Sequence, residues 1–348
     1  MFCSIVFCFK KLIVATKRKL FSSALDASRL NRLLLRVHRW SGLLVLNYHR
    51  IGNWDKSLLD RHLFSASAEN FEKQIRYLAS HFDLIGLDDL ENVLNQKSGR
   101  HVMISFDDGY RDNYEHAFPI LKKYHVPATF FLTTGYLDNM PVPWWDEIAW
   151  MVHSSTSFKL PQGGWLEQPL EWNEQSRESV IHQILKCYKQ LSPHQTEPFL
   201  NFLAEETNSG RYSQPQEESL WMTWDMVREM RFAGMSFGGH TVNHPVLSTL
   251  SKADQNFEIA ECKRRLEEEL NEPVETFSYP VGGVSAFNQM TQECLKENGF
   301  RWAFSYYGGY HRFTETNFNP LDLPRIPIEP DVDIPQLRSL TALPQLFS

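Results

Sequence analysis

The sequence contains few cysteines, no long apolar run and no nucleotide-binding motif. None of its five cysteines forms a C-x-x-C pair, which argues against a disulfide framework and a cysteine zinc site and indicates a reducing compartment. No stretch reaches the roughly 18 consecutive apolar residues of a membrane-spanning helix. No G-x-G-x-x-G or Walker loop follows an apolar run, which disfavours nucleotide binding. With 348 residues, 42% of them apolar, the chain is expected to fold around a sizeable core.

Acidic residues are nearly missing from the first 50 positions. This stretch has ten Lys and Arg residues against the single carboxylate of Asp26, which gives it a net charge of +9. Because the whole chain has a net charge of −7, the remaining residues carry −16. We expect residues 1–40 to form a basic amphipathic segment that either packs on its own domain or lies on anionic lipid. The expected location is the cytoplasm, with peripheral contact at the inner membrane face. The acidic remainder disfavours nucleic-acid binding.

Short runs rich in Val, Ile and Phe alternate with helical patterns along the chain. The runs, each expected to be a strand, span residues 43–49, 82–87, 102–106, 128–134, 235–240, 275–280, 301–306 and 323–328. Thr223 can cap the start of a helix, and Gly234 and Gly299 suit helix ends. This alternation predicts parallel strands, and their number favours a barrel over an open sheet.

The expected domain organisation follows from this alternation. The α/β barrel is assigned to residues 41–330, and residues 331–348 are expected to be a C-terminal tail. Residues 146–220 break the alternation with turns and a hairpin, a helical stretch and a polar loop. They are expected to form a helical insertion between two barrel strands.

Two adjacent aspartates follow one of these strands. Asp107 and Asp108 come directly after residues 102–106, and Gly109 allows a sharp turn behind them. In parallel α/β barrels the side chains at the carboxyl ends of strands point into the site. An Asp-Gly pair alone would indicate only a turn, but two repelling carboxylates side by side suggest separate roles.

Two histidines follow another strand with a spacing that suits a metal ion. His240 and His244 are four residues apart, behind the small Gly238 and Gly239. Such a pair alone is more often a surface or core feature, but combined with a carboxylate at another strand end it predicts a metal site. Two imidazoles and one carboxylate suit Zn²⁺, with Co²⁺, Ni²⁺ or Mn²⁺ as alternatives. Such an ion lowers the pKa of water toward about 7, and the second aspartate can then take the proton.

At several places the sequence resembles the polysaccharide deacetylases, carbohydrate esterase family 4 with its NodB-homology domain. The motifs that resemble the first three of the family, in order within residues 43–328, are SFDDG (105–109), HTVNHP (240–245) and FSYPVGG (277–283). Two further stretches resemble a branch in which a Tyr-His strand precedes the metal motif: VLNYHRI (45–51) and PWWDEIAW (143–150).

The resemblance implies a distorted (β/α) barrel of about seven strands and a metal-dependent hydrolase. Family members remove N-acetyl groups from amino sugars, so the expected substrate is an N-acetylated polysaccharide or glycan intermediate, as in exopolysaccharide biosynthesis. Carried over by position, the resemblance makes Asp107 the general base and makes Asp108, His240 and His244 the metal ligands.

The third motif departs from the family pattern. Many members have Arg-Pro-aromatic where this chain has Tyr279-Pro280-Val281. The resemblance implies that a backbone N–H at this turn binds the oxyanion; the N–H of Val281 is our candidate, with Tyr279 and Pro280 beside the substrate. The arginine that braces the base in other members is missing here. Arg325, in the last strand, is expected to replace it, and the alternative is an ion pair that only closes the barrel.

The general acid that protonates the leaving amine is less evident. Many relatives carry a histidine in a late Leu-x-His motif, and residues 329–348 contain none. His49, at the end of the first strand, is our candidate; the alternatives are His311, a water molecule, or a purely structural role for His49. Trp145 is expected to stack on a sugar ring, although tryptophans at this spacing are also common in cores.

Two other functions fit parts of the sequence. A deacylase or deformylase of a lipid-linked sugar at the inner membrane face would suit the basic N-terminus. A glycan-binding module that has lost catalysis would suit the missing late histidine, but Asp107 beside a complete ligand set argues against it.

Overall fold

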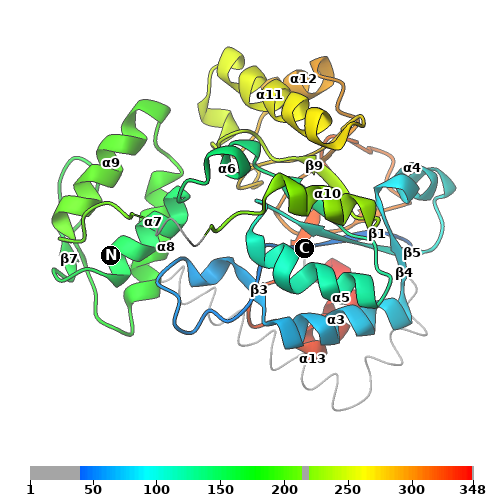
Figure 1. The fold of residues 1–348 in the computed structure, drawn as a ribbon, viewed down its shortest axis with the longest axis horizontal. Coiled ribbons are helices and arrows are strands. Elements are labelled where there is room, and N and C mark those ends of the chain that lie inside the picture. The colour runs from blue at the N-terminus through cyan, green and yellow to red at the C-terminus, as the bar shows by residue number, and fades with distance from the viewer. Residues whose placement is uncertain (1–39, 214–218, 347–348) are drawn as a thin grey trace.

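The computed structural model describes residues 40–213 and 219–346, and its strands and helices alternate along the chain (Figure 1). All eight runs predicted as strands are confirmed: β1 (Gly42–Tyr48), β4 (Asp83–Ile85), β5 (Arg100–Phe106), β6 (Thr129–Leu132), β9 (Ser236–Gly239), β10 (Thr276–Ser278), β11 (Trp302–Phe304) and β13 (Arg325–Pro327). The basic segment predicted at residues 1–40 lies, apart from Trp40, outside the described residues.

Seven of these strands form a curved sheet in the order β13-β1-β5-β6-β9-β10-β11, and all of them pair in parallel. β4 also pairs with β5, and the short β12 (His311–Arg312) runs antiparallel to the start of β1. One parallel bridge between Phe304, in β11, and Leu323, just before β13, joins the two edges of the sheet. The predicted distorted barrel of about seven strands is therefore confirmed, with a thin seam between β11 and β13.

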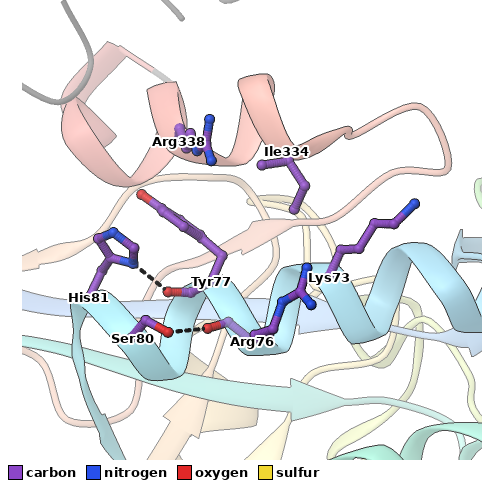
Figure 2. A pocket seen from close by; sticks show the side chains of 7 residues that line it. All are labelled: Lys73, Arg76, Tyr77, Ser80, His81, Ile334 and Arg338. Atoms are coloured by element: carbon purple, nitrogen blue, oxygen red, sulfur yellow. Dashed lines mark hydrogen bonds between the residues drawn. The ribbon is translucent and has the colours of Figure 1, made fainter. Parts of the chain in front are cut away.

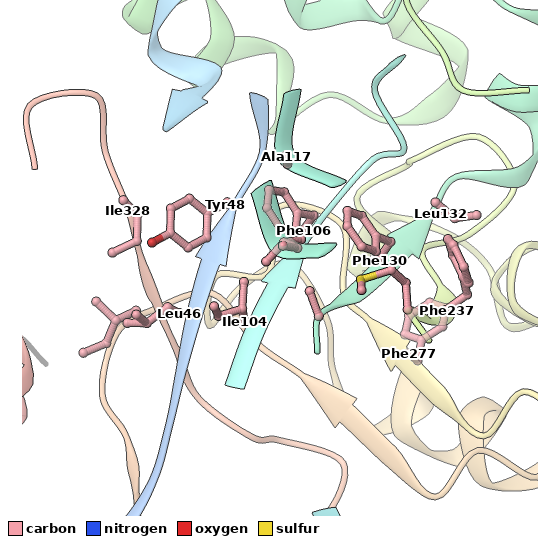
Figure 3. Packing of buried hydrophobic residues seen from close by; sticks show 14 of the residues in the cluster. Leu46, Tyr48, Ile104, Phe106, Ala117, Phe130, Leu132, Phe237, Phe277 and Ile328 are labelled. Carbon is pink, nitrogen blue, oxygen red and sulfur yellow. The ribbon is translucent and has the colours of Figure 1, made fainter. Parts of the chain in front are cut away.

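Both faces of the sheet are buried. Successive side chains of a strand point to opposite faces. Leu46, Ile104 and Phe130 lie on one face (Figure 3), in a cluster that includes residues of the outer helices, whereas Val45 and Phe131 belong to a separate inner cluster. Strands buried on both faces read as nearly continuous apolar runs. This is why the sequence alone locates them.

Helices cover the outside of the sheet and connect its strands: α3 (Ala68–His81), α4 (Leu87–Gln96), α5 (Phe118–Lys123), α6 (Thr134–Asn139), α10 (Trp224–Phe232), α11 (Lys252–Leu270) and α12 (Gln289–Glu297). The predicted helix ends are confirmed. The Thr223 side chain accepts a hydrogen bond from the N–H of Met226 at the start of α10. Gly234 and Gly299, with φ of +93° and +74°, follow α10 and α12. A small separate sheet pairs β2 (Arg50–Ile51) with β3 (Phe64–Ala66).

The region predicted as a C-terminal tail contains the helix α13 (Ile334–Ala342), which lies against α3. Leu337 and Leu340 of α13 are buried in the main core. A surface pocket lies between the two helices (Figure 2), and its lining includes none of the predicted site residues: Lys73, Arg76, Tyr77, Ser80, His81, Ile334 and Arg338. Among the described residues, no helix combines the length and the apolar character needed to cross a bilayer.

The insertion forms a second apolar core at one side of the barrel (Figure 1, left). Its elements are α7 (Trp144–His153), the hairpin of β7 (Lys159–Leu160) and β8 (Leu170–Glu171), α8 (Arg177–Tyr188) and α9 (Pro193–Glu206). The predicted hairpin and α8 are confirmed. α9 is not evident from the sequence, because Pro193 and Pro198 interrupt its pattern. Pro193 stands in the first turn, where the missing N–H removes no helical hydrogen bond.

Candidate metal and catalytic site

The three predicted metal ligands meet at the carboxyl ends of β5 and β9. Asp108 follows β5, and His240 and His244 follow β9. The Nε2 atoms of both histidines lie 3.4 Å from Asp108 Oδ1, and one ligand atom from each residue lies within 4.8 Å of the other two. All three side chains are buried, and Asp108 Oδ1 accepts no hydrogen bond from a described residue. A buried carboxylate oxygen facing two imidazole nitrogens fits a divalent metal ion.

Unusual backbone conformations bring these ligands together. Asp108 has a φ of +76° and precedes Gly109 at +94°, while His244 has a φ of +54°. Positive φ is uncommon for residues with a side chain, and Asp and His are among those that adopt it most. The loop between the histidines is held by Glu258 of α11, whose Oε2 accepts hydrogen bonds of 2.8 Å from both N–H groups of residues 242–243. The α-helix that follows β9 thus shapes the loop between the two candidate ligands.

The two histidines differ at the ring nitrogen that faces away from Asp108. Nδ1 of His240 lies 2.8 Å from the carbonyl oxygen of Ser278, whereas Nδ1 of His244 is buried without a hydrogen-bond partner among the described residues. Burial lowers the pKa of His244 to about 3, so this ring is neutral. Burial alone would also lower the pKa of His240, but the carboxylates of Asp107 and Asp108 raise it. Because only an unprotonated Nε2 binds a metal ion, metal binding at His240 would compete with proton binding.

Asp107, beside the ligand set, forms a buried ion pair with Arg325. Nη1 and Nη2 of Arg325 each donate a hydrogen bond of 2.8 Å to one oxygen of the carboxylate, and the Arg325 side chain is 0% exposed. Burial alone would raise the pKa of Asp107, but the charges of Arg325 and His240 outweigh it and hold that pKa well below its usual range. The structure therefore brings Arg325 to the position where the sequence predicted a brace for the base.

The strand order explains how Arg325 reaches Asp107. β13, which begins with Arg325, pairs with β1, and β1 pairs with β5, which ends just before Asp107. Asn47 of β1 lies between the two and bonds to both, at 2.6 Å to Arg325 and 3.2 Å to Asp107. Ser278 of β10 also donates to Asp107. Neither Asn47 nor Ser278 was expected in the site. A polar residue inside an apolar strand is, however, a sequence feature that could have identified both as candidates.

His49 lies at the same rim of the barrel, directly after β1. Its ring packs edge-on against that of Tyr306, with 5.4 Å between ring centroids, and its backbone N–H donates to Ser65 Oγ. Burial lowers the pKa of His49, while the nearby charges of Asp108 and Asp107 act in the opposite direction. The structure thus brings this candidate acid close to both aspartates.

The alternative acid, His311, lies at the other end of the same strand. It pairs with Leu43 at the start of β1, whereas His49 follows the end of β1. At about 3.3 Å per residue, this places the two histidines roughly 20 Å apart. Nδ1 of His311 lies 3.6 Å from Glu315. His311 is therefore not in reach of the candidate site.

The third motif forms a strained turn. Val281 and Gly282 have φ of +62° and +61°, and the N–H of Gly282 donates to the carbonyl oxygen of Pro280 at 2.6 Å. A β-branched residue with positive φ is an outlier that costs on the order of 1–3 kcal/mol. The N–H of Val281 donates no hydrogen bond to any residue that the structure describes. It is therefore available to a ligand, whereas the Pro280 ring is buried.

Tyr279, predicted to lie beside the substrate, points into the core instead. Its ring stacks on that of Phe287, with 3.8 Å between centroids, and its hydroxyl donates to the carbonyl oxygen of Leu321 at 2.7 Å. Its side chain is 0% exposed. A substrate contact by this side chain is not supported, because both its ring and its hydroxyl are engaged by residues of the protein interior.

Trp145, predicted to stack on a sugar ring, is also buried. The side chain is 5% exposed, its ring lies 4.5 Å from that of His244, and its Nε1–H donates to Tyr110 Oη at 2.7 Å. A ring enclosed in this way offers no open face to a sugar. The predicted stacking role is therefore not supported, and Trp145 instead packs against His244, a candidate metal ligand.

Comparison with known proteins extends these findings. Poly-beta-1,6-N-acetyl-D-glucosamine N-deacetylase of Staphylococcus aureus (strain MSSA476) is 38% identical over 115 residues, which are 29% of this chain and 39% of that relative. The enzyme of the same name from Staphylococcus epidermidis is 38% identical over 109 residues, 28% of this chain and 37% of the relative. The matched region thus spans less than half of these curated relatives.

Solved structures share the fold at low sequence identity. The deacetylase PplD of Streptococcus pyogenes, solved in complex with acetate, superposes with a TM-score of 0.57 at 19% identity, over 87% of this chain and 99% of that chain. IcaB from Ammonifex degensii gives a TM-score of 0.55 at 20% identity, over 87% and 97% of the two chains.

The family assignment rests on a match over most of the barrel. The family model for polysaccharide deacetylase matches residues 95–303, more than half of the chain. This range contains both aspartates, both histidines and the third-motif turn. The chain belongs to the polysaccharide deacetylase family.

Proposed function

We propose that this protein is a metal-dependent polysaccharide N-deacetylase, a hydrolase that cleaves the amide bond between an acetyl group and an amino sugar. The observation that carries the proposal is the different surroundings of two adjacent carboxylates. Asp108 faces the Nε2 atoms of His240 and His244 at 3.4 Å, while Asp107 is bound by Arg325 on both oxygens. Membership of the family supports the same activity.

Asp108, His240 and His244 are the residues that would hold the metal ion. Two nitrogen donors and one carboxylate leave coordination positions open and suit Zn²⁺, while Co²⁺, Ni²⁺ and Mn²⁺ accept the same donors. A divalent ion held there would polarise the acetyl carbonyl and lower the pKa of a water molecule.

Asp107 would act as the general base. It is kept ionised at neutral pH by Arg325, so it can accept a proton as a water oxygen attacks the acetyl carbon. The negative charge then develops on the acetyl oxygen, where the N–H of Val281 would donate a hydrogen bond. The strained φ of +62° at Val281 supports this role, because strain of this kind is often retained at functional sites.

His49 would donate a proton to the leaving nitrogen. Burial lowers the pKa of His49, but the charges of Asp108 and Asp107 oppose this effect and favour the protonated form that the step requires. The carbon–nitrogen bond then breaks, and the products are acetate and a free amino sugar. The proton lost by His49 balances the proton gained by Asp107, so passing one proton between them through solvent restores the starting state. Its position after β1, within the fields of both aspartates, supports this assignment.

We propose β-1,6-linked poly-N-acetylglucosamine as the substrate class, because the curated relatives carry that specificity in their names. The test is acetate release from β-1,6-linked N-acetylglucosamine oligosaccharides, with β-1,4-linked chitooligosaccharides beside them. We expect release that a chelator abolishes and Zn²⁺ or Co²⁺ restores, faster on the β-1,6 linkage. Equal rates would reject the linkage proposal, and no chelator-sensitive release from either substrate would reject the activity and favour a glycan-binding module.

We further propose that the basic N-terminus brings the protein to the cytoplasmic membrane surface. The net charge of +9 over residues 1–50 supports it, because each basic residue near an anionic surface contributes about 1 kcal/mol. Sedimentation with anionic lipid vesicles should capture the full chain and release it at high salt. A chain lacking residues 1–38 that sediments equally well would reject this proposal.

A further inference from the structure

The metal ligand His244 lacks the support that His240 has. Metal-binding histidines normally donate their second ring N–H to an oxygen, which fixes the orientation of the ring. His240 has such a partner in the carbonyl oxygen of Ser278, but Nδ1 of His244 has none among the described residues. Another contact must therefore hold the His244 ring toward Asp108.

The indole of Trp145 provides that contact. The rings of Trp145 and His244 meet at 64° with 4.5 Å between their centroids. Trp145 is itself fixed by the hydrogen bond of 2.7 Å from its Nε1–H to Tyr110 Oη. The orientation of His244 thus depends on where Tyr110 holds the indole.

Asp146 determines the direction of this hydrogen-bond chain. Tyr110 Oη lies 2.9 Å from Asp146 Oδ2, and the backbone N–H of Asp60 donates to Asp146 Oδ1 at 2.9 Å. A hydroxyl has one hydrogen to donate. Because the Tyr110 hydrogen goes to the Asp146 carboxylate, the lone pairs of Tyr110 Oη are left to accept the bond from Trp145.

All the side chains in this series of hydrogen bonds are buried. Tyr110 and Asp146 are both 0% exposed, so water cannot replace a lost partner. Tyr110 also follows Asp108 by two residues, and the guanidinium of Arg50 lies 4.5 Å from the centre of its ring. A shift of Tyr110 would therefore be felt at two of the three ligands.

We propose that Asp146 is a positioning residue for the metal ligand His244, acting through Tyr110 and Trp145. The inference rests on the proposed function only in requiring that Asp108, His240 and His244 bind a divalent cation. It makes no use of the substrate, so it can be tested by metal binding alone.

The test compares Asp146→Asn with the wild-type full chain, using Zn²⁺ and Co²⁺ as probes. An asparagine has one oxygen, so either Tyr110 or the Asp60 N–H would face its NH₂ group. We expect Zn²⁺ affinity, measured by competition with a chromophoric chelator, to fall about tenfold, and the visible spectrum of the Co²⁺ form to change. Unchanged affinity together with an unchanged spectrum would overturn the proposal.

Glu147→Gln is the matched control. Glu147 is the next residue of the same helix. It accepts hydrogen bonds of 2.6 and 3.0 Å from Arg211, whereas Asp146 accepts one from Tyr110. Its loss should weaken the insertion without changing Zn²⁺ affinity. An equal loss of affinity in this variant would overturn the proposal, because the effect would then follow from general loosening of α7.

The path through Tyr110 is tested by a double variant. Tyr110→Phe removes the hydroxyl, so adding Asp146→Asn to it should lower Zn²⁺ affinity by less than a further twofold. Independent, multiplicative losses would overturn the path. If Asp146→Asn does not fold, Tyr110→Phe alone replaces it: the ring remains, but the hydroxyl that links Asp146 to Trp145 is lost, and wild-type affinity would overturn the proposal.

The outcome is separable from that of the proposed function. A wild-type protein that binds Zn²⁺ but releases no acetate would reject the deacetylase activity, and the comparison of affinities would still support or overturn the role of Asp146. A wild-type protein that binds none of the divalent ions would reject both.

Discussion

At the scale of single residues, two adjacent aspartates acquire different properties from their partners. Arg325 binds both oxygens of Asp107, whereas Oδ1 of Asp108 faces only histidine nitrogens. The left-handed backbone at Asp108 allows neighbouring side chains to reach these separate partners. One carboxylate is thus suited to hold an ion and the other to accept a proton.

Replacing the base should stop turnover without emptying the metal site. For Asp107→Asn we expect the rate of acetate release to fall by roughly 10²–10⁴-fold, because the proton acceptor is lost. Zn²⁺ affinity should stay within a few-fold of wild type, because Asp107 is not one of the three ligands. Asp108→Asn is the contrasting variant and should lose Zn²⁺ affinity. A variant at position 107 with wild-type turnover would contradict the assignment of the base.

Removing the brace should destabilise the fold. Arg325→Met leaves the carboxylate of Asp107 buried and unpaired, and breaking such a pair costs about 3–5 kcal/mol. Urea unfolding at pH 7 measures this loss. Adding Asp107→Asn should recover part of it, because no buried charge then remains. A single variant as stable as wild type would show that the pair contributes nothing.

The ion pair between Asp107 and Arg325 should also make the stability of the fold depend on pH. The pKa of Asp107 is lower in the folded than in the unfolded chain. Its contribution to stability is therefore full above the unfolded pKa of about 3.9 and is lost as the pH falls through the lower, folded pKa. Arg325→Met should lack this acid-sensitive component when unfolding is compared at pH 7 and pH 3.

At the scale of elements, helix α11 supports the loop between His240 and His244 through Glu258. Glu258→Gln keeps the size of the side chain but places an NH₂ group against N–H donors of residues 242–243. We expect a loss of about 1–3 kcal/mol in unfolding free energy and about tenfold weaker Zn²⁺ binding. Glu261→Gln, on the same helix but paired with Arg264, should change neither. Equal behaviour of the two variants would contradict a role for Glu258 in the loop.

The insertion should make folding sensitive to mild acid through His153 of α7. Burial, aided by the charges of Arg61 and Arg177, lowers the pKa of His153 to about 4. Between pH 6.5 and pH 4 the unfolded chain binds a proton that the folded chain does not, so stability is full above pH 6.5 and falls through this window. His153→Gln should flatten the profile measured by urea unfolding from pH 8 to pH 5, while the exposed His194→Gln should not. An unchanged slope would contradict this.

The elements also show what a sequence can and cannot predict here. The strands are recognisable because burial on both faces makes them apolar throughout, and Asp108, His240 and His244 are recognisable because each follows such a run. The roles of Tyr279 and Trp145 cannot be recognised from the sequence, because they depend on the direction in which each ring points after its element has packed. Asn47 and Ser278 meet Asp107 only through the strand order, and no local spacing encodes that order.

At the scale of the whole molecule, metal binding should be linked to folding. A ligand at 100 times its Kd that binds only the folded state stabilises it by about 2.7 kcal/mol. Thermal unfolding of the wild type should therefore shift upward by a few degrees with Zn²⁺ and return with a chelator. Asp108→Asn should not respond. A wild-type Tm that none of Zn²⁺, Co²⁺, Ni²⁺ or Mn²⁺ changes would contradict the metal site.

The seam between β11 and β13 has a consequence for how the protein is made. Its last barrel strand carries Arg325, which must reach a carboxylate 218 positions earlier in the chain. During translation, Asp107, Asp108 and both histidines all emerge from the ribosome before that strand does. Until Arg325 has been added, Asp107 lacks its charge partner, so we expect the proposed hydrolysis only from chains that include the final strand.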